Sequence, residues 1–215
     1  ESGQEIIRVA YLFNEALSID NQYALAFAGL ADCYGQRVIR FNYNRSWIDS
    51  ALYAADLALK INPNLEEAYK AKGLGYMALD TVKLAEHNND KALEINPGYF
   101  TAVANKGVML FSKGNLFDSR NYLDKSITLN PTSTSTELVH LSAIYHLLEQ
   151  NEKSDEYLFK AIKNSPNVIT SYNRGIYMSL RIGDFDKAKI IMDKFQDNIG
   201  DEDRLSFFNG LIFYF

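Results

Sequence analysis

The side chains best suited to acid–base or metal chemistry are few and widely spaced. The chain has three histidines, His87, His140 and His146, and a single cysteine, Cys33. His140 and His146 are six positions apart, which places them on different faces of a helix rather than around one metal ion. Cys33 has no histidine beside it in its helical segment, so we expect a packed side chain rather than a nucleophile. The sequence therefore predicts no catalytic residue, metal site or cofactor, and we interpret the chain as non-enzymatic.

The charge balance bears on the class of ligand. The 215 residues include 22 Lys or Arg and 27 Asp or Glu, which gives a formal net charge of −5. Surfaces that bind nucleic acid need an excess of basic residues, so we do not expect direct nucleic-acid binding. GLGY at 73–76 lies inside a helical pattern and lacks the strand that precedes a phosphate-binding loop. Binding to a protein or peptide is the class of function that remains.

Targeting signals are absent from the printed sequence. Its apolar runs are shorter than the roughly 20 residues of a membrane span, and its first residues lack the basic-then-apolar plan of a signal peptide. A lone cysteine fits a reducing compartment. We therefore expect a soluble protein, with a slight preference for the cytoplasm. The chain opens inside a helical pattern and closes on the apolar SFFNGLIFYF, so we also expect a fragment of a longer protein.

All four prolines fall on one period. They end the phrases KINP, EINP, TLNP and KNSP and lie 34, 34 and 35 residues apart, at Pro63, Pro97, Pro131 and Pro166. A small residue precedes each proline by five positions, namely Ala58, Ala92, Ser126 and Ala161. A period of this length is typical of a solenoid of helix pairs. Proline disfavours helical geometry in the residue before it, so each phrase predicts the end of a second helix.

Two glycines occur at the same phase of successive repeats. Gly73 and Gly107 each fall in the middle of a predicted first helix. Glycine in a helix interior costs about 1 kcal/mol relative to alanine. Its recurrence at one phase predicts that neighbouring helices approach each other closely at this point.

These motifs resemble the tetratricopeptide repeat, with its aromatic, Leu-Gly, Tyr, Ala, aromatic, Ala and Pro positions. Residues 66–99 match at Tyr69, Gly73, Tyr76, Ala85, Ala92 and Pro97, and later copies are more degenerate. The resemblance implies an all-α fold, a right-handed α-solenoid of antiparallel helix pairs over residues 1–215. It divides the chain into a half repeat 1–23, repeats 24–65, 66–99, 100–134, 135–168 and 169–202, and a half repeat 203–215.

The resemblance also implies a peptide-binding groove lined by the first helix of each pair. The family's groove positions fall here on Asp32, Lys70, Leu74, Met77, Asn105, Val108, Phe111, His140, Asn173, Arg174 and Tyr177. One subclass grips a peptide's C-terminal carboxylate with five polar groups, of which this chain keeps Lys70 and Asn105 and lacks three. We therefore do not expect that carboxylate clamp. Lys70, Asn105 and Arg174 remain candidates for contacting a peptide backbone or an acidic side chain.

The first full repeat contains an insertion. It has 42 residues, and the excess of eight lies between Tyr34 and Ala51. We expect a first helix lengthened by one or two turns, then a turn, then a second helix capped by Ser46. The inserted hairpin carries Arg37, Arg40, Phe41, Tyr43, Arg45 and Trp47. Aromatic and arginine side chains are typical of binding hot spots, but these residues could equally pack against one another, and the sequence leaves both open.

The function that we expect is non-catalytic recognition of a protein or peptide. Residues 20–70 also resemble tetratricopeptide regions of bacterial signalling and transcriptional regulators, which implies the sensing or interaction part of a larger protein. One alternative is a structural scaffold that self-associates through the apolar C-terminal helix, although the loss of that helix's own partner would expose the same residues. Another is a region that positions the substrate of an enzyme whose catalytic domain lies outside this chain.

Overall fold

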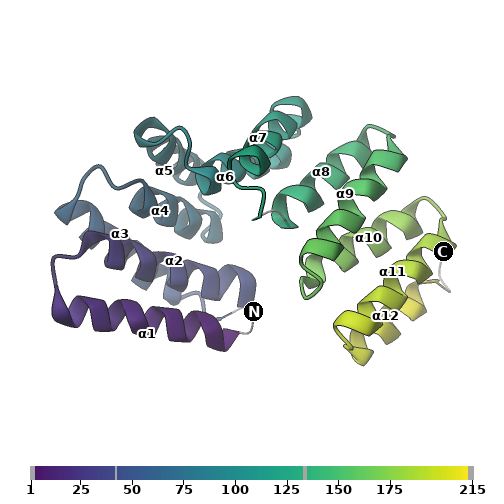
Figure 1. Cartoon of the computed structure of the whole chain (residues 1–215), viewed down its shortest axis with the longest axis horizontal. Helices are drawn as coiled ribbons and strands as arrows, with labels where there is room; N and C mark the ends of the chain where they lie inside the picture. Colours follow the sequence, from purple (N-terminus) through teal and green to yellow (C-terminus); the bar gives the residue numbers. More distant parts are fainter. Residues whose placement is uncertain (1–2, 42, 133–134, 213–215) are drawn as a thin grey trace. The chain divides into compact units, whose positions relative to one another are not determined.

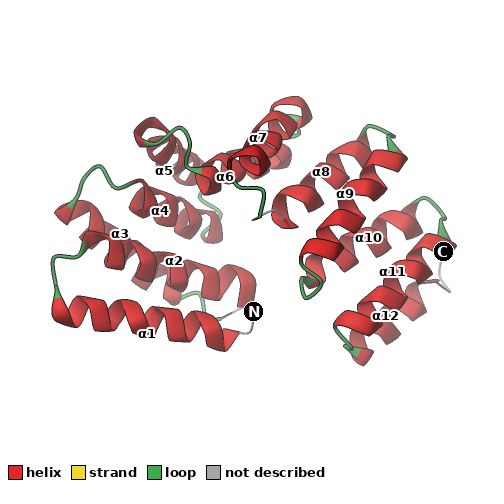
Figure 2. Ribbon diagram, viewed as in Figure 1, coloured by secondary structure: helices red, strands yellow, loops and turns green. Residues whose placement is uncertain are grey.

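The computed structural model describes residues 3–41, 43–132 and 135–212. In this part of the chain every regular element is a helix, as Figure 2 shows, and the predicted all-α fold is confirmed. The helices are α1 (Gly3–Ile19), α2 (Ala24–Phe41), α3 (Trp47–Ile61), α4 (Glu66–Ala78), α5 (Val82–Ile95), α6 (Phe100–Ser112), α7 (Leu116–Leu129), α8 (Ser135–Leu147), α9 (Asn151–Asn164), α10 (Ile169–Arg181), α11 (Phe185–Asn198) and α12 (Glu202–Ile212).

The chain forms two compact units, Glu1–Met109 and Leu110–Phe215, and α6 contributes residues to both. Within each unit consecutive helices pack as antiparallel pairs, such as α2 with α3 and α8 with α9 (Figure 1). The printed pairs within the units are α2 with α3, α4 with α5, α8 with α9 and α10 with α11, and each falls inside one of the predicted full repeats. That all repeats join into a single solenoid domain stays a prediction.

Three of the second helices end at a turn that the asparagine before the proline stabilises, whereas Ser165 precedes the fourth proline. The side-chain Oδ1 of the asparagine accepts a hydrogen bond from the backbone N–H two residues later. This contact occurs at Asn62–Asn64 (3.1 Å), Asn96–Gly98 (3.0 Å) and Asn130–Thr132 (3.2 Å). Asp20 makes the same contact with Gln22 at 2.9 Å, where no proline is present. The helix stop therefore combines the proline's restriction with an Asx turn.

The small residues of the repeat lie where helices pack most tightly. Ala58, Ala92, Ser126 and Ala161, the four residues five positions before the prolines, are completely buried. A Cβ atom on Gly73 would lie only 3.2 Å from the carbonyl oxygen of Ala85 on α5. The close helix contact predicted at Gly73 is therefore confirmed.

The insertion lengthens α2, as expected. This helix has 18 residues, whereas the equivalent first helix α4 has 13. Ser46 precedes α3, but its hydroxyl makes no capping hydrogen bond, so that detail of the sequence prediction is wrong. The Ser46 backbone N–H instead donates to Oδ1 of Asn44 at 2.9 Å, and this bond shapes the turn.

An aromatic core joins the last three helices of the second unit. Tyr172 on α10, Phe195 on α11 and Phe208 on α12 are all buried. The Phe195 ring lies 5.6 Å from the ring of Tyr172 and 6.1 Å from that of Phe208. Phe195 occupies the position where the earlier repeats have Ala or Ser. Its larger ring packs against the rings of both Tyr172 and Phe208. These contacts anchor α12 and set its place opposite α10.

We expect Glu149→Gly to stabilise the protein. Glu149 has a positive φ of 58° in the turn between α8 and α9, where the equivalent turn after α10 carries Gly183 at 75°. Glycine removes the left-handed strain, so the free energy of unfolding in urea should rise by about 0.5–1 kcal/mol. The control Glu156→Gly, in the middle of α9, should lower it by about 1 kcal/mol. Equal destabilisation by both changes would contradict a strained turn.

Candidate functional site

The second unit brings three of the predicted groove residues together from three first helices. The rings of Phe111 (α6) and His140 (α8) lie edge to face with centroids 5.3 Å apart. The guanidinium carbon of Arg174 (α10) lies 5.9 Å from the Phe111 centroid. We name Phe111, His140 and Arg174 the groove cluster. It combines an aromatic platform with one permanent and one titratable cation.

Burial disfavours the charged form of both basic side chains in the groove cluster. Desolvation lowers the pKa of Arg174. Burial also lowers the pKa of His140, and the nearby charge of Arg174 adds to this effect. His140 Nδ1 lies 2.8 Å from the carbonyl oxygen of Thr136. Because a carbonyl only accepts, Nδ1 carries the proton and Nε2 is bare in the neutral ring.

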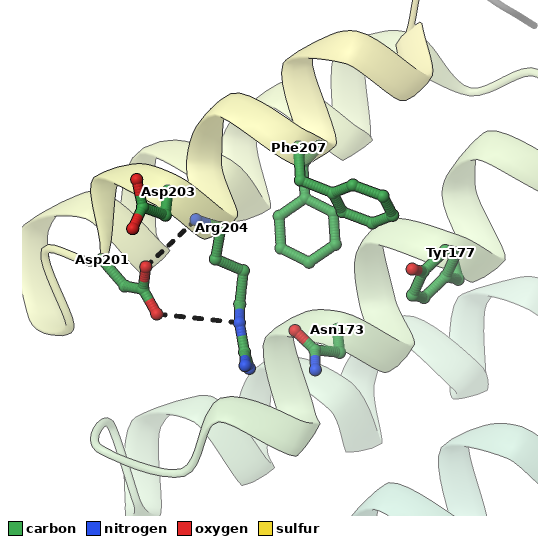
Figure 3. A pocket seen from close by; sticks show the side chains of 7 residues that line it. Asn173, Tyr177, Asp201, Asp203, Arg204 and Phe207 are labelled. Carbon is green, nitrogen blue, oxygen red and sulfur yellow. Dashed lines mark hydrogen bonds and ion pairs between the residues drawn. The ribbon is translucent and has the colours of Figure 1, made fainter.

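A pocket of about 540 Å³ lies between α10 and α12 (Figure 3). Tyr177 and Phe207 form its apolar walls, with side chains that are 47% and 55% exposed. The buried Phe208 ring contacts Tyr177 edge to face at 5.9 Å. Asn173 also lines the pocket, and its buried Oδ1 has no hydrogen-bond donor among the described residues. The pocket therefore offers aromatic surface and an unsatisfied acceptor side by side.

The charged lining of this pocket comes from α12 and from Asp201, the residue that precedes it. Nε of Arg204 lies 3.7 Å from Oδ2 of Asp201, and the Arg204 backbone N–H donates to Oδ1 of the same carboxylate at 3.0 Å, as drawn in Figure 3. Asp203 completes the lining. Sequence analysis did not select these α12 residues, because it treated the C-terminal segment only as an apolar end. Continuing the first-helix phase by one more repeat would have found them.

In the first unit, two predicted groove residues bind each other. Nζ of Lys70 (α4) forms an ion pair with Oδ1 of Asp32 (α2), and the Lys70 side chain is only 11% exposed. Leu74 is buried, one turn further along α4, and its Cδ2 would lie 3.1 Å from a Cβ on Gly35. The Lys70 ammonium is thus already neutralised by a carboxylate. Met77, Asn105 and Val108 are partly buried on α4 and α6.

The inserted hairpin is held by an arginine that packs against two neighbouring rings. Arg37 is only 7% exposed, and its guanidinium carbon lies 4.4 Å from the Trp47 ring centroid and 5.3 Å from that of Tyr34. The two aromatic rings are themselves 5.1 Å apart. Arg37 and Trp47 therefore pack against each other across the α2–α3 pair.

The remaining hairpin residues differ in their surroundings. Arg45 donates a hydrogen bond from Nη2 to the carbonyl oxygen of Ala78 at 2.6 Å and lies 3.6 Å from Asp80. This contact ties the inserted turn to the end of α4. Tyr43 is exposed. The predicted contact residues Arg40 and Phe41 have side chains that lie outside the described part of the structure.

Metal ligation, thiol reactivity and membrane crossing can each be compared with the described residues. No three His, Cys, Asp or Glu side chains there are grouped to hold a metal ion. Cys33 is buried, and that burial raises the pKa of its thiol to about 11. None of the helices in the part of the chain described combines the length and apolar character that a membrane crossing requires.

No protein-family model and no curated protein matches the sequence. Solved structures do match. The chain superposes on the Cut9–Hcn1 hetero-tetramer of the APC/C with a TM-score of 0.78 and 16% identity, covering 97% of this chain and 39% of that one. YrrB, a TPR protein with an unusual peptide-binding site, matches with a TM-score of 0.54 and 17% identity, covering 89% and 94%. The fold is that of tetratricopeptide-repeat proteins.

Human IFIT1, solved as a dimer with PPP-AAAA, has a TM-score of 0.73 and 16% identity, covering 90% of this chain and 46% of that one. The chain therefore spans about two fifths of the length of the Cut9 match and under half of the IFIT1 match. At these identities the comparisons establish the α-solenoid architecture of tetratricopeptide repeats and nothing about ligands.

We expect Arg37→Ala to change the environment of the only tryptophan. Removing the guanidinium uncovers one face of the Trp47 ring, so its fluorescence emission should shift to longer wavelength in the folded protein. The Arg45 side chain instead contacts Ala78 and Asp80. Arg45→Ala therefore removes a charge from the same hairpin and should leave the emission maximum unchanged. An identical spectrum for Arg37→Ala and the parent would show that the stack does not persist in solution.

We expect Cys33 to resist alkylation in the folded state. The thiolate is the reactive form, and a pKa of about 11 leaves little of it near neutral pH. Iodoacetamide should modify native Cys33 at least about a hundredfold more slowly than the urea-unfolded chain. Rapid modification of the native protein would contradict the packed position of this side chain.

Proposed function

We propose that this chain is a non-catalytic binding region that recognises a segment of another protein with the first-helix face of its second unit. The observation that carries the proposal is the pocket between α10 and α12. There the exposed rings of Tyr177 and Phe207 lie beside Asn173, whose buried Oδ1 has no donor in the described part of the chain.

An extended peptide matches both features of the pocket. A bulky apolar side chain placed between the two rings would leave water, and aromatic pockets of this kind are where binding energy concentrates. A backbone N–H of the same peptide would satisfy Oδ1 of Asn173 once that side chain turns toward the pocket, and the lack of a donor among the described residues makes this exchange favourable. An apolar anchor and a backbone contact together favour a peptide over a small polar ligand.

Charge favours a protein ligand over a nucleic acid. The fold by itself does not decide, because the similar structures include one described with a peptide-binding site and one solved with PPP-AAAA. The chain has a net charge of −5, and the carboxylates of Asp201 and Asp203 line the pocket. Phosphate-rich ligands need a basic surface to offset their charge.

The resemblance of residues 20–70 to bacterial regulators supports a wider context for this binding. On that basis the chain is the interaction or sensing region of a larger bacterial signalling protein. An enzyme whose substrate these repeats position remains the alternative for the parent protein. Phe207, which is 55% exposed on α12, supports a second function, self-association through that helix.

Peptide selection tests the binding function. A library of random displayed peptides selected on the intact chain should converge on sequences with a bulky apolar residue. Asn173→Ala with Tyr177→Ala should weaken the selected peptides by at least about tenfold, because they remove the acceptor and one wall. Tyr53→Ala removes a ring that is 67% exposed on the second helix α3 and serves as the control.

Two results would contradict the proposal. The first is a selection in which no peptide is enriched over an empty support. The second is a set of selected peptides that bind the double variant and the parent with equal affinity. Light scattering over a concentration series addresses self-association: a dimer that Phe207→Ser disperses would assign the exposed α12 ring to contact between copies instead.

A further inference from the structure

The pocket between α10 and α12 has an aromatic end and an acidic end (Figure 3). At the aromatic end the rings of Phe207 and Tyr177 both contact the buried ring of Phe208, with centroids 5.8 and 5.9 Å from it. At the acidic end, Asp201 and Asp203 lie at the start of α12. The apolar side chain of the proposed peptide occupies the aromatic end, so the acidic end is left to another group of the same partner.

The two carboxylates at the acidic end differ in what they already bind. Oδ1 of Asp201 accepts a hydrogen bond from the Arg204 backbone N–H at 3.0 Å, and Oδ2 lies 3.7 Å from Nε of Arg204. Asp201 therefore caps α12 and is the partner of the guanidinium in the pocket. Asp203 is exposed in the first turn of α12 and forms no hydrogen bond or ion pair with a described residue. Its carboxylate is available to a ligand.

Charge and hydrogen bonding at the acidic end both favour a cation. The lining sets the carboxylates of Asp201 and Asp203 against the single guanidinium of Arg204, which leaves an excess of negative charge. A carboxylate only accepts hydrogen bonds, and Oδ1 of Asn173 also has no donor among the described residues. The exposed aromatic rings next to these acceptors attract cations to their faces. A positively charged hydrogen-bond donor therefore complements this end of the pocket.

We propose that the acidic end of the pocket binds an arginine side chain of the partner segment, beside the apolar side chain held between the rings of Tyr177 and Phe207. This inference rests on the proposed peptide-binding function and adds the chemistry of the partner. The guanidinium donates to the Asp203 carboxylate while its planar face lies against an aromatic ring. The net charge of −5 on the chain also attracts a basic segment.

The composition of the pocket favours arginine over lysine. A guanidinium is planar, so it can donate two hydrogen bonds to one carboxylate and stack on an aromatic ring at the same time. An ammonium is a compact, strongly hydrated point charge that cannot stack. The free carboxylate of Asp203 and the exposed rings of Tyr177 and Phe207 line the same pocket, so a guanidinium can use both. An acidic side chain would be repelled by Asp203.

The test uses immobilised mixtures of synthetic peptides on the intact chain. Both ends of each peptide are blocked, which removes the terminal charges. Each peptide has a fixed central Phe, random neutral residues elsewhere, and one residue within two positions of the Phe that is Arg, Lys, Gln or Glu. The Arg mixture should retain at least about threefold more protein than the Gln mixture, because a salt bridge and a cation–π contact are gained. The Lys mixture should fall between them, and the Glu mixture should retain least.

Three variants assign this preference to the pocket. Asp203→Asn removes the charge and keeps the shape, so it should abolish the preference for Arg and leave retention by the Gln mixture unchanged. Asp193→Asn is the matched control, because Asp193 is exposed on the second helix α11 and lies outside the pocket lining. It should leave the preference intact. Arg204→Gln removes the cation that competes for Asp201 and should increase the preference at least about twofold.

The outcomes separate the arginine contact from peptide binding itself. Equal retention by the Arg, Gln and Glu mixtures, or an Arg preference that survives Asp203→Asn, overturns the arginine contact and spares peptide binding. The same holds for a preference that Asp193→Asn reduces as much as Asp203→Asn does, or that Arg204→Gln fails to increase. Equal retention by the Lys and Arg mixtures overturns the choice of a guanidinium. Retention by no mixture overturns peptide binding and the arginine contact together.

Discussion

The structure depends on the inability of one helix pair to bury its own apolar surface. Each pair must pack against the next, and the contact is close only where side chains are small. Ala58, Ala92 and Ala161 meet this demand as completely buried residues, and Gly73 allows α4 to approach the backbone of α5.

This packing commits one side of each first helix to the core and leaves the other side available. What that free side carries differs between the two units. In the first unit Lys70 and Asp32 neutralise each other, and Leu74 is buried. In the second unit Arg174 lies against the Phe111 ring, and no carboxylate of the described residues forms a printed ion pair with it. The same kind of helix pair thus carries a paired lysine in the first unit and a pocket with two exposed aromatic rings in the second.

Much of the fold could be predicted because its signals are local and repeated. The proline phrases located the ends of the second helices, and the absence of a breaker after Gly35 predicted the long α2. Contacts between residues far apart in sequence could not be predicted in this way. The pairing of Lys70 with Asp32 joins positions 38 residues apart, and the stacking of Arg37 on Trp47 depends on how α2 and α3 cross.

The candidate site was foreseen in part for the same reason. The repeat phase selected Phe111, His140 and Arg174, but it gave no indication that they share one ring contact. It also stopped before α12, whose Arg204 and Phe207 complete the pocket. Helix periodicity identifies which residues share a face. Whether a charged side chain on that face is paired depends on the positions of neighbouring side chains in three dimensions, which periodicity does not give.

Site-specific photo-crosslinking tests the central claim most directly. A photoreactive phenylalanine analogue would replace Tyr177, on the first-helix face, or Tyr53, on the second helix α3, and each protein would be irradiated with a selected peptide. The account predicts a crosslinked product from position 177 and none from position 53. Crosslinking from position 53 alone, or equally from both, would contradict recognition by the first-helix face.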